Sequence, residues 1–242
     1  MTSPRLAPPF WQHDAYTLRQ LAAAVREAAA NALPEGHASP SRVIDLGAGD
    51  APYRSLFEAR GAEYLACDID AAPPLRIVPG RPLPLADGSA RAVLSFQVLE
   101  HVWDLDAYLG EARRLLADDG ALVLSTHGTW LYHPHPEDWR RWTRDGLLRE
   151  LKTRGFEATR VWSLVGPLAW TTQFRAIGYA RALAALPLIG PLLAALNSSV
   201  MHLRMRIEDA LTPQPWIDGN AAVYLVLARK SALLTPSPSP SP

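Results

Sequence analysis

One stretch of eight residues, from Val43 to Asp50, constrains the fold of this chain more than any other. It reads Val-Ile-Asp-Leu-Gly-Ala-Gly-Asp, an apolar run that holds one aspartate and ends in two closely spaced glycines. We expect a buried strand over 42–46 that turns sharply into a helix, because glycine lets the backbone come close to a bound ligand. A Gly-x-Gly turn alone is a weak signal, so its meaning depends on the elements around it.

Hydrophobic periodicity predicts that strands and helices alternate along the chain. After the first strand, we expect strands over 63–68, 75–78, 93–96, 121–125, 156–164 and 221–227. Apolar residues at helical spacing predict helices over 16–33, 50–60, 104–116 and 143–154. This alternation predicts an α/β fold with a seven-stranded, mostly parallel sheet and helices on both of its faces.

The 242 residues divide into three parts. Residues 1–34 form an N-terminal extension and helix, 35–230 form one α/β domain, and 231–242 are a Pro/Ser tail that we expect to be disordered. Between the last two strands, a helical hairpin is expected as an insertion over about 165–216, with helices near 168–186 and 190–211.

The hairpin contains a charge-free run from Ala182 to Leu196. This run is too short, and too interrupted by proline, to span a bilayer, which takes about 20 apolar residues. Apolar side chains of this kind favour burial, so three uses stay open. The hairpin can pack on the domain as a lid, form a homodimer interface, or rest on a membrane surface to reach a lipid-linked acceptor.

Composition excludes several classes of protein. The formal net charge is zero, so no basic field invites nucleic acid. Cys67 is the only cysteine, which rules out an internal disulfide framework and a cysteine-based zinc cluster, and fits a reducing compartment. The N-terminus lacks the apolar core of a signal peptide. We expect a cytoplasmic protein, with peripheral contact at the inner face of the membrane left open.

The residues after the glycine turn discriminate between cofactors. A dinucleotide fingerprint needs a third glycine three residues after the second, and this chain has Pro52 there, which disfavours a nucleotide-cofactor oxidoreductase. The pattern that fits is Asp-x-Gly-x-Gly on the first strand with Asp68 closing the second. That spacing suits an acid that binds ribose hydroxyls from the neighbouring strand. Asp70 is the alternative acid for this role.

Five segments in chain order resemble the class I S-adenosylmethionine-dependent methyltransferases of the methyltransferase type 11-like group. They are Val43–Gly49, Ala66–Asp70, Leu83–Ser89, Gln97–Val102 and Glu111–Leu116. The resemblance covers roughly residues 40–165. It implies a Rossmann-like sheet, S-adenosyl-L-methionine as cofactor, and methyl transfer, most simply to oxygen, on a small-molecule, glycan or lipid-linked acceptor. The stretch Tyr132–Thr143 resembles a subgroup associated with bacterial glycan or natural-product pathways.

The resemblance also implies cofactor-binding residues. Asp45, Gly47 and Gly49 would enclose the methionine half of the cofactor, and Asp68 would bind its ribose. Gln97, at the end of the fourth strand, would lie beside the sulfonium through its backbone carbonyl.

The chain departs from the family pattern where the adenine is read. Many members carry an acid in the stretch that corresponds to 78–82, which has none here, and an aspartate where this chain has Arg91. Asp87 is therefore a candidate adenine ligand, beside the backbone around Leu85 and Ala86.

The loop after the fifth strand carries the candidates for acceptor chemistry. Methyl transfer requires alignment of donor and acceptor, and an oxygen acceptor must also lose its proton, a task for which histidine is suited near neutral pH. We predict His133 and His135 as candidate general bases. Trp130, Trp139 and Arg141 are candidates for holding an acceptor, by stacking or by pairing with an anionic group. The same side chains can instead order the loop.

Two further expectations complete the sequence-based hypothesis. No metal is expected, because the histidines lack helical ligand spacing and Pro134 and Pro136 stiffen the loop. The alternative function is a catalytically inactive S-adenosylmethionine-binding module that recruits a partner through the apolar hairpin. The intact turn from Asp45 to Gly49 argues against that alternative.

Overall fold

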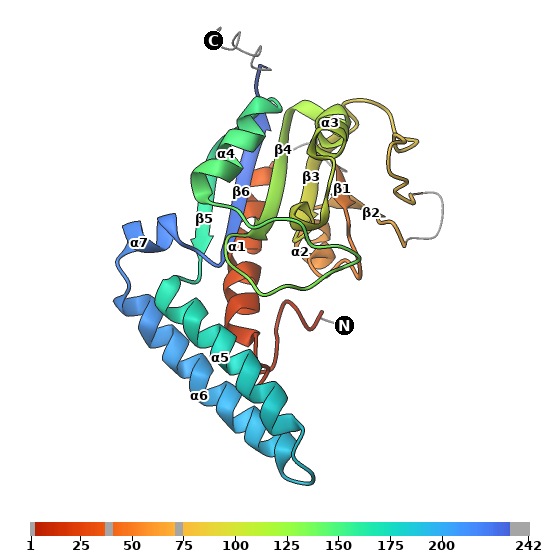
Figure 1. Cartoon of the computed structure of the whole chain (residues 1–242). Helices are drawn as coiled ribbons and strands as arrows, with labels where there is room; N and C mark the ends of the chain where they lie inside the picture. Colours follow the sequence, from red (N-terminus) through yellow and green to blue (C-terminus); the bar gives the residue numbers. More distant parts are fainter. Residues whose placement is uncertain (1–2, 37–40, 71–74, 233–242) are drawn as a thin grey trace, which may run out of the picture.

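The computed structural model describes residues 3–36, 41–70 and 75–232. They form a six-stranded sheet in the order β2-β1-β3-β4-β6-β5, flanked by helices (Figure 1). Neighbours β2, β1, β3 and β4 pair in parallel, whereas β6 is antiparallel to both β4 and β5, so the sheet is mixed. The strands are β1 Ser41–Leu46, β2 Ala62–Cys67, β3 Ala90–Phe96, β4 Leu116–His127, β5 Phe156–Leu164 and β6 Val223–Lys230.

The sheet has six strands rather than the predicted seven, because the strand expected over 75–78 is missing from the sheet of the described residues. This stretch contributes only an isolated parallel bridge between Asp68 and Arg76. Pro79 follows directly, and a proline cannot donate to a ladder of backbone hydrogen bonds. The stretch therefore does not extend the sheet beyond β2.

The helices of the α/β core are α1 Ala15–Ala32, α2 Arg54–Glu58, the 3₁₀-helix η1 Leu99–His101, α3 Leu105–Leu115 and α4 Arg144–Thr153. Side chains cap the first turns of α3 and α4. The Asp104 side chain accepts a hydrogen bond from the Ala107 backbone N at 2.9 Å, and Thr143 accepts one from Gly146 at 3.1 Å. Helix α2 is shorter than the expected 50–60, because the chain is still in left-handed conformations at Gly49 and Ala51.

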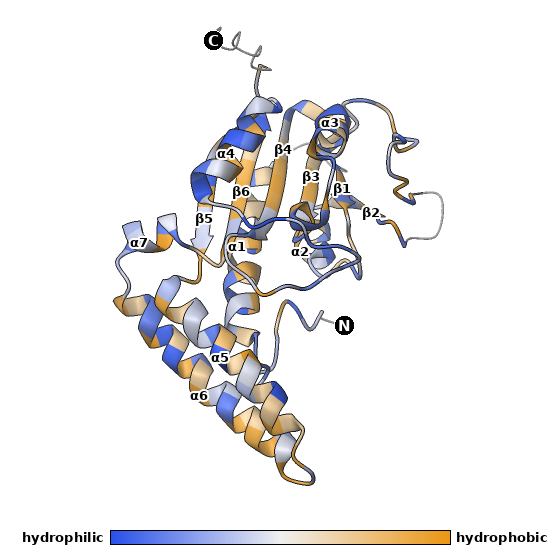
Figure 2. Ribbon diagram, in the orientation of Figure 1, coloured by the Kyte–Doolittle hydropathy of each residue, from blue (hydrophilic) through white to orange (hydrophobic). Residues whose placement is uncertain are grey.

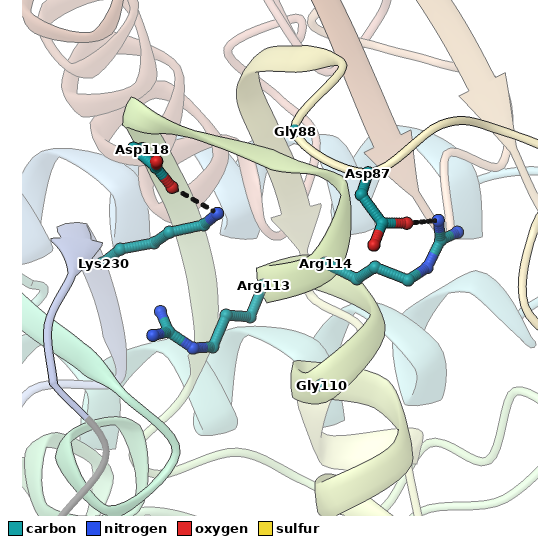
Figure 3. A pocket seen from close by; sticks show the side chains of 7 residues that line it. All are labelled: Asp87, Gly88, Gly110, Arg113, Arg114, Asp118 and Lys230. Carbon is teal, nitrogen blue, oxygen red and sulfur yellow. Dashed lines mark hydrogen bonds and ion pairs between the residues drawn. The ribbon is translucent and has the colours of Figure 1, made fainter.

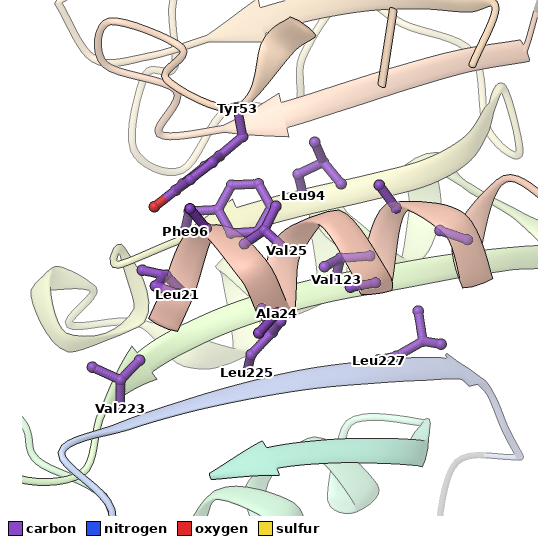
Figure 4. Close-up of a cluster of buried hydrophobic side chains, with 14 of the residues drawn as sticks. Leu21, Ala24, Val25, Tyr53, Leu94, Phe96, Val123, Val223, Leu225 and Leu227 are labelled. Carbon is purple, nitrogen blue, oxygen red and sulfur yellow. The ribbon is translucent and has the colours of Figure 1, made fainter. Parts of the chain in front are cut away.

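Alternation along the strands divides the core into two layers. Odd-numbered residues of β1, β4 and β6, such as Val43, Val123 and Leu225, pack against α1, and even-numbered ones, such as Ile44, pack against α3 and α4. Figure 4 shows Val25 of α1 among the side chains of the first layer. Burial on both faces is what a sheet between helical layers requires, and it leaves only the strand ends for function.

Two long helices separate β5 from β6. They are α5 Pro167–Ala184 and α6 Gly190–Leu211, followed by the short helix α7 Gln214–Gly219, which the sequence did not predict. The pair α5 and α6 lies side by side and extends well beyond the sheet (Figure 1). In the described part of the chain, no helix is both long and apolar enough to cross a membrane. Residues 233–242 of the predicted tail lie outside the described residues.

Candidate functional site

The two glycines after β1 form a turn that other residues cannot easily form. Gly47 has φ +78° and Gly49 has φ +52°, both in the left-handed region. A Cβ atom on Gly47 would lie 2.6 Å from Val98 Cγ2, so this position has no room for a side chain. A Cβ on Gly49 would meet no atom within 4 Å. The turn is therefore packed on one side and open on the other, as a ligand cradle must be.

Asp68, at the end of β2, is fixed against this turn. The Gly49 backbone N donates a hydrogen bond to Asp68 Oδ2 at 2.8 Å, and the Asp70 backbone N donates to Oδ1 at 3.1 Å. A carboxylate has about four acceptor positions, so two contacts leave capacity for hydroxyl donors. Of the two acids considered from sequence, Asp68 is the one in contact with the turn, because β1 and β2 are paired neighbours.

Asp45 is buried beneath the turn with only 1 % of its surface exposed. The Tyr64 hydroxyl donates a hydrogen bond to Asp45 Oδ2, while Oδ1 is buried and has no hydrogen-bond partner. Burial raises the pKa of Asp45 to about 6, in spite of the Tyr64 hydrogen bond that favours the carboxylate. An unpartnered buried carboxylate oxygen beside an open turn fits a site for a cationic ligand group.

Gln97 lies where β3 ends, at the same edge of the sheet as the glycine turn. Its φ of +56° is unusual for a residue other than glycine. The conformation is held by Ser125 of β4, whose carbonyl oxygen accepts from the Gln97 backbone N at 2.9 Å and whose Oγ accepts from Gln97 Nε2 at 3.0 Å. Left-handed residues of this kind concentrate at functional sites.

Asp87 is not at this edge. It precedes β3, so it lies at the start of the strands rather than at their carboxyl ends. It lines a cavity of about 510 Å³. Its Oδ1 pairs with Arg114 Nη1 at 2.6 Å, and Figure 3 shows the two side chains facing each other. The structure therefore does not bring Asp87 together with the other residues predicted to bind the cofactor.

A cluster of polar side chains, which we call the histidine cluster, lies next to Gln97 at the ends of β3 and β4. It consists of Glu100, His127 and His133. Glu100 is fully buried and His127 nearly so. Glu100 Oε1 lies 2.8 Å from His127 Nδ1, close enough for an ion pair but not aligned as a hydrogen bond, and Thr126 Oγ1 donates to Glu100 Oε2 at 2.7 Å. Burial raises the pKa of Glu100, but His127 and Thr126 outweigh it and hold this pKa below its ordinary value.

His133 is the half-buried member of the histidine cluster. Its ring lies 4.9 Å from the His127 ring and 5.1 Å from the His101 ring, edge-on to both. Desolvation, together with the neighbouring His127, lowers the pKa of His133, so the ring is neutral near neutral pH. Its Nδ1 is 3.2 Å from the Leu131 carbonyl oxygen, an arrangement that places the proton on Nδ1 and leaves Nε2 as the basic nitrogen.

The three residues of the histidine cluster also form a set that can hold a metal ion. Each offers one ligand atom, and these atoms lie within 4.8 Å of one another. The fold brings these three residues together from separate parts of the chain. Their spacing in the sequence therefore does not predict this set.

The remaining predicted acceptor residues lie around the cluster at different depths. Trp130 stacks on His127 with ring centroids 5.0 Å apart and planes 6° from parallel. Trp139 is 44 % exposed and packs against Trp103 with ring centroids 4.8 Å apart. His135 is exposed and is not a member of the histidine cluster. Trp130 thus supports the cluster, whereas Trp139 and Trp103 form an accessible aromatic surface beside it.

Arg141 is engaged within its own loop, 128–142. Its guanidinium donates to both carboxylate oxygens of Asp138, at 2.5 and 2.7 Å, in a bidentate pair. The other donors reach the carbonyl oxygens of Trp130, Leu131 and Arg140 at 3.2, 2.8 and 2.7 Å. An arginine has five N–H donors, and all five are used here. Arg141 therefore orders the loop and has no donor left for an anionic acceptor.

Sequence reasoning missed two partners in the site. Tyr64, on β2, was not a candidate, because only the pairing of β1 with β2 brings its hydroxyl to Asp45. Glu100 lies in the segment Gln97–Val102 but was not a candidate site residue, and its pairing with His127 links two strand ends that are far apart in sequence. The one signal for Glu100 in the sequence is its position soon after the strand predicted over 93–96. That position does not identify the residue with which Glu100 pairs.

Comparison with known proteins identifies the family. The family model described as methyltransferase domain matches residues 11–181, most of the chain. This chain belongs to the methyltransferase-domain family. It is 27 % identical over 134 residues to a probable S-adenosylmethionine-dependent methyltransferase of Mycobacterium tuberculosis, covering 51 % of this chain and 46 % of that protein. It is 35 % identical over 81 residues to a protein of Mycolicibacterium smegmatis with the same description, covering 31 % of this chain and 32 % of that one. The chain thus spans less than half the length of these curated relatives.

Solved structures support the same fold. A putative sarcosine dimethylglycine methyltransferase from Galdieria sulphuraria superposes with a TM-score of 0.55 at 15 % identity, covering 88 % of both chains. The 1,6-didemethyltoxoflavin-N1-methyltransferase of Burkholderia thailandensis gives a TM-score of 0.51 at 20 % identity, covering 87 % of this chain and 79 % of that one. That second structure contains S-adenosylhomocysteine. These likenesses establish an α/β Rossmann-like methyltransferase fold.

Proposed function

We propose that this protein transfers a methyl group from S-adenosylmethionine to a hydroxyl group of a small-molecule or glycan acceptor. The observation that carries the proposal is the shared position of two features at the carboxyl edge of the sheet. One is the open glycine turn over the unpartnered oxygen of Asp45. The other is the histidine cluster, which begins three residues after Gln97. A methyl donor held by the first would face an acceptor held at the second, as ligands in open α/β sheets do.

Residues of the turn would hold the cofactor. The backbone of Gly47 and Gly49 would follow its methionine half, and the Asp45 carboxylate would face its cationic amino group. The free acceptor positions of Asp68 would take the ribose hydroxyls. When bound, S-adenosylmethionine supplies an electrophilic methyl group on a sulfonium, so the protein's tasks are alignment and exclusion of water.

The acceptor would lie between the histidine cluster and the exposed aromatic surface. His133 is neutral near pH 7 and can accept the hydroxyl proton at Nε2 as the methyl group is transferred. Glu100 favours the positive charge that His133 acquires, whereas the neighbouring His127 opposes it, which keeps His133 neutral before the reaction. His135, exposed on the same loop, is the second candidate base. Trp139, with Trp103, offers a face on which a sugar or aromatic ring can stack.

Calorimetry and turnover with labelled S-adenosylmethionine test this proposal in two stages. We expect micromolar binding of S-adenosylmethionine and none of NAD, with binding abolished in Asp45→Ala. We expect His133→Ala to bind the cofactor normally and to turn over at least about a hundredfold more slowly, the usual contribution of a general base. Glu137→Ala, an exposed position in the same loop, is the matched control and should behave as the wild type.

The outcomes are separable. Absence of S-adenosylmethionine binding would overturn the enzyme assignment. Normal binding without methylation of any component of cell extracts would favour the catalytically inactive binding module. Normal turnover in His133→Ala would remove His133 as the base and leave the donor assignment intact, after which His135→Ala becomes the deciding variant.

A further inference from the structure

The end of the α5–α6 pair that lies farthest from the sheet, which we call the hairpin tip, exposes large apolar side chains. It comprises residues 183–196, between the two helices and including the first turns of α6. The exposed side chains there, with their exposed fractions, are Leu186 (44 %), Leu188 (99 %), Ile189 (58 %), Leu192 (71 %) and Leu196 (60 %). In Figure 2 the ribbon at this end of the hairpin is coloured mostly as hydrophobic. Side chains of this size strongly favour burial, so this surface is an interaction site.

Leu188 shows that the surface is not a by-product of the turn. Its φ of +63° lies in the left-handed region, where a turn would ordinarily use glycine or asparagine. Leucine therefore carries a backbone cost there, and its side chain makes almost no contact within the described chain, since 99 % of it is exposed. Neither local conformation nor packing in the fold accounts for leucine at this position.

The charges around the tip have one sign. From Pro167 to Ile207 the sequence contains four arginines and no aspartate, glutamate or lysine. The arginines are Arg175, Arg181, Arg204 and Arg206, and all four are exposed. Arg204 pairs with Glu208 at 2.7 Å, just outside this stretch. Arg181, three residues before the end of α5, is the arginine near the tip, and the other three lie farther along the two helices. An apolar end with a nearby arginine and no acid complements an anionic lipid surface, which attracts basic residues electrostatically and takes apolar side chains below its headgroups.

The same charges disfavour a second copy of the chain as the occupant. A symmetric dimer through the tip would bring two copies of Arg181 toward each other, with no acid within 167–207 to pair them. Like charges that face each other across an interface are repulsive.

A groove beside the tip adds an independent feature. Its volume is about 310 Å³, and it lies between the N-terminal segment and the two helices. Small residues line much of it, with Trp11 and Arg181 also present. Trp11 is 61 % exposed. Tryptophan and arginine next to apolar surface are typical of the level at which a protein meets lipid headgroups.

We propose that the hairpin tip inserts into the interface of an anionic membrane and holds the enzyme there to methylate an acceptor carried on a lipid. The second part of this inference rests on the proposed function, and the membrane contact does not.

The distance along α5 between the candidate site and the hairpin tip restricts the class of acceptor further. Phe174 of α5 contacts Trp130, the residue stacked on the histidine cluster, with ring centroids 5.9 Å apart. From Phe174 to the end of α5 at Ala184 the helix rises about 15 Å. The site therefore stands roughly 15 Å or more from the lipid interface when α5 stands upright on it. A headgroup hydroxyl at the bilayer surface would be out of reach, so the acceptor is a group on a spacer, such as the sugar of a lipid-linked glycan.

Vesicle flotation of the full chain, without cofactor or acceptor, tests the membrane contact. We expect the wild type to float with phosphatidylglycerol-containing vesicles at low salt, to bind less as salt is raised, and to stay unbound with phosphatidylcholine alone. Leu188→Asp should lower vesicle binding at least about tenfold. It removes a leucine that the membrane would bury, and it adds a negative charge that anionic lipids repel. Leu211→Asp is the matched control: this leucine is 74 % exposed at the end of α6 that lies away from the tip, and we expect less than about a twofold change there.

Three results would overturn the membrane contact. They are no flotation with any vesicle, equal losses in Leu188→Asp and Leu211→Asp, or a stable dimer in light scattering that Leu188→Asp dissociates. Calorimetry with S-adenosylmethionine on the same samples separates the two proposals. Cofactor binding without flotation removes the membrane contact and keeps the methyltransferase proposal. Flotation without cofactor binding removes the methyltransferase proposal and keeps the membrane contact, and either result removes the lipid-linked acceptor. Methylation of a soluble glycan at the rate of the lipid-linked one would refute the acceptor class.

Discussion

Replacement of Asp45 by asparagine should make the protein more stable while it impairs cofactor binding. Asp45 is buried, and one of its oxygens has no partner. Its pKa in the folded protein is about 6, compared with 3.8 for a free aspartate. A raised pKa means that the folded state holds a proton more tightly than the unfolded state does. The contribution of Asp45 to stability is therefore fully present below pH 4 and is lost as the pH rises to about 6.

The magnitude follows from the size of this shift. A difference of about 2 pKa units corresponds to about 3 kcal/mol of unfavourable free energy at neutral pH, at about 1.4 kcal/mol per unit. Asparagine carries no charge and can still accept the hydrogen bond from Tyr64. The Asp45→Asn variant should thus gain stability over the wild type with rising pH, from nothing below pH 4 to about 3 kcal/mol at pH 7.

Urea unfolding of both proteins between pH 4 and 8 measures this difference directly. Asp70→Asn, which alters an exposed acid just after the neighbouring strand β2, is the control and should show no such slope. In calorimetry, Asp45→Asn should bind S-adenosylmethionine at least about tenfold more weakly, since it loses a charge-assisted contact. A stability difference that is constant or falls with pH would refute the reasoning about burial. Unchanged cofactor affinity would remove Asp45 from the binding site.

Four further predictions concern the turn, the loop and the cluster. Gly47→Ala should cost about 1–3 kcal/mol in urea unfolding, because its Cβ would clash with Val98, and Gly49→Ala should cost less; equal costs would contradict the close approach at Gly47. Arg141→Lys should speed proteolysis within 128–142 and slow turnover with little change in cofactor affinity, and an unaltered cleavage rate would count against its ordering role. The acid limb of the turnover profile should have its midpoint below pH 6.5, since the pKa of His133 is lowered, and a midpoint above 6.5 would exclude His133 as the base. Dialysis against a chelator should leave turnover unchanged, and loss of activity together with a stoichiometric metal in elemental analysis would make His133 a ligand instead.

Elements dominated by local signals were predictable from the sequence. The glycine turn, the helix expected over 143–154 and the strand expected over 63–68 each depend on residues within a few positions of one another. The prediction of a strand over 75–78 was wrong because local signals do not show whether a strand has a partner. Its apolar residues satisfy the periodicity, but a strand needs a neighbour along its whole length, and the structure provides one bridge.

The sequence predicts which site residues lie at the same edge of the sheet, but it does not predict which of them are in contact. Asp45, Asp68 and Gln97 follow from the rule that the carboxyl ends of parallel strands share an edge. The pairs Asp45–Tyr64 and Glu100–His127 do not follow, since each depends on the register between strands. Asp87 was misplaced because a motif match gives an order along the chain and not an end of the sheet.

The loop 128–142 has a consequence for how acceptors are selected. It is tied to the 3₁₀-helix and the residues after it, because the Trp139 backbone N donates to the Glu100 carbonyl oxygen at 2.9 Å and Arg140 Nη2 donates to that of Trp103 at 2.9 Å. Ordering a loop costs about 1–2 kcal/mol per residue in backbone entropy, and here folding has already met that cost. Under the proposed function, an arriving acceptor would meet an ordered wall rather than a closing lid. We then expect discrimination between acceptors to depend on their shape.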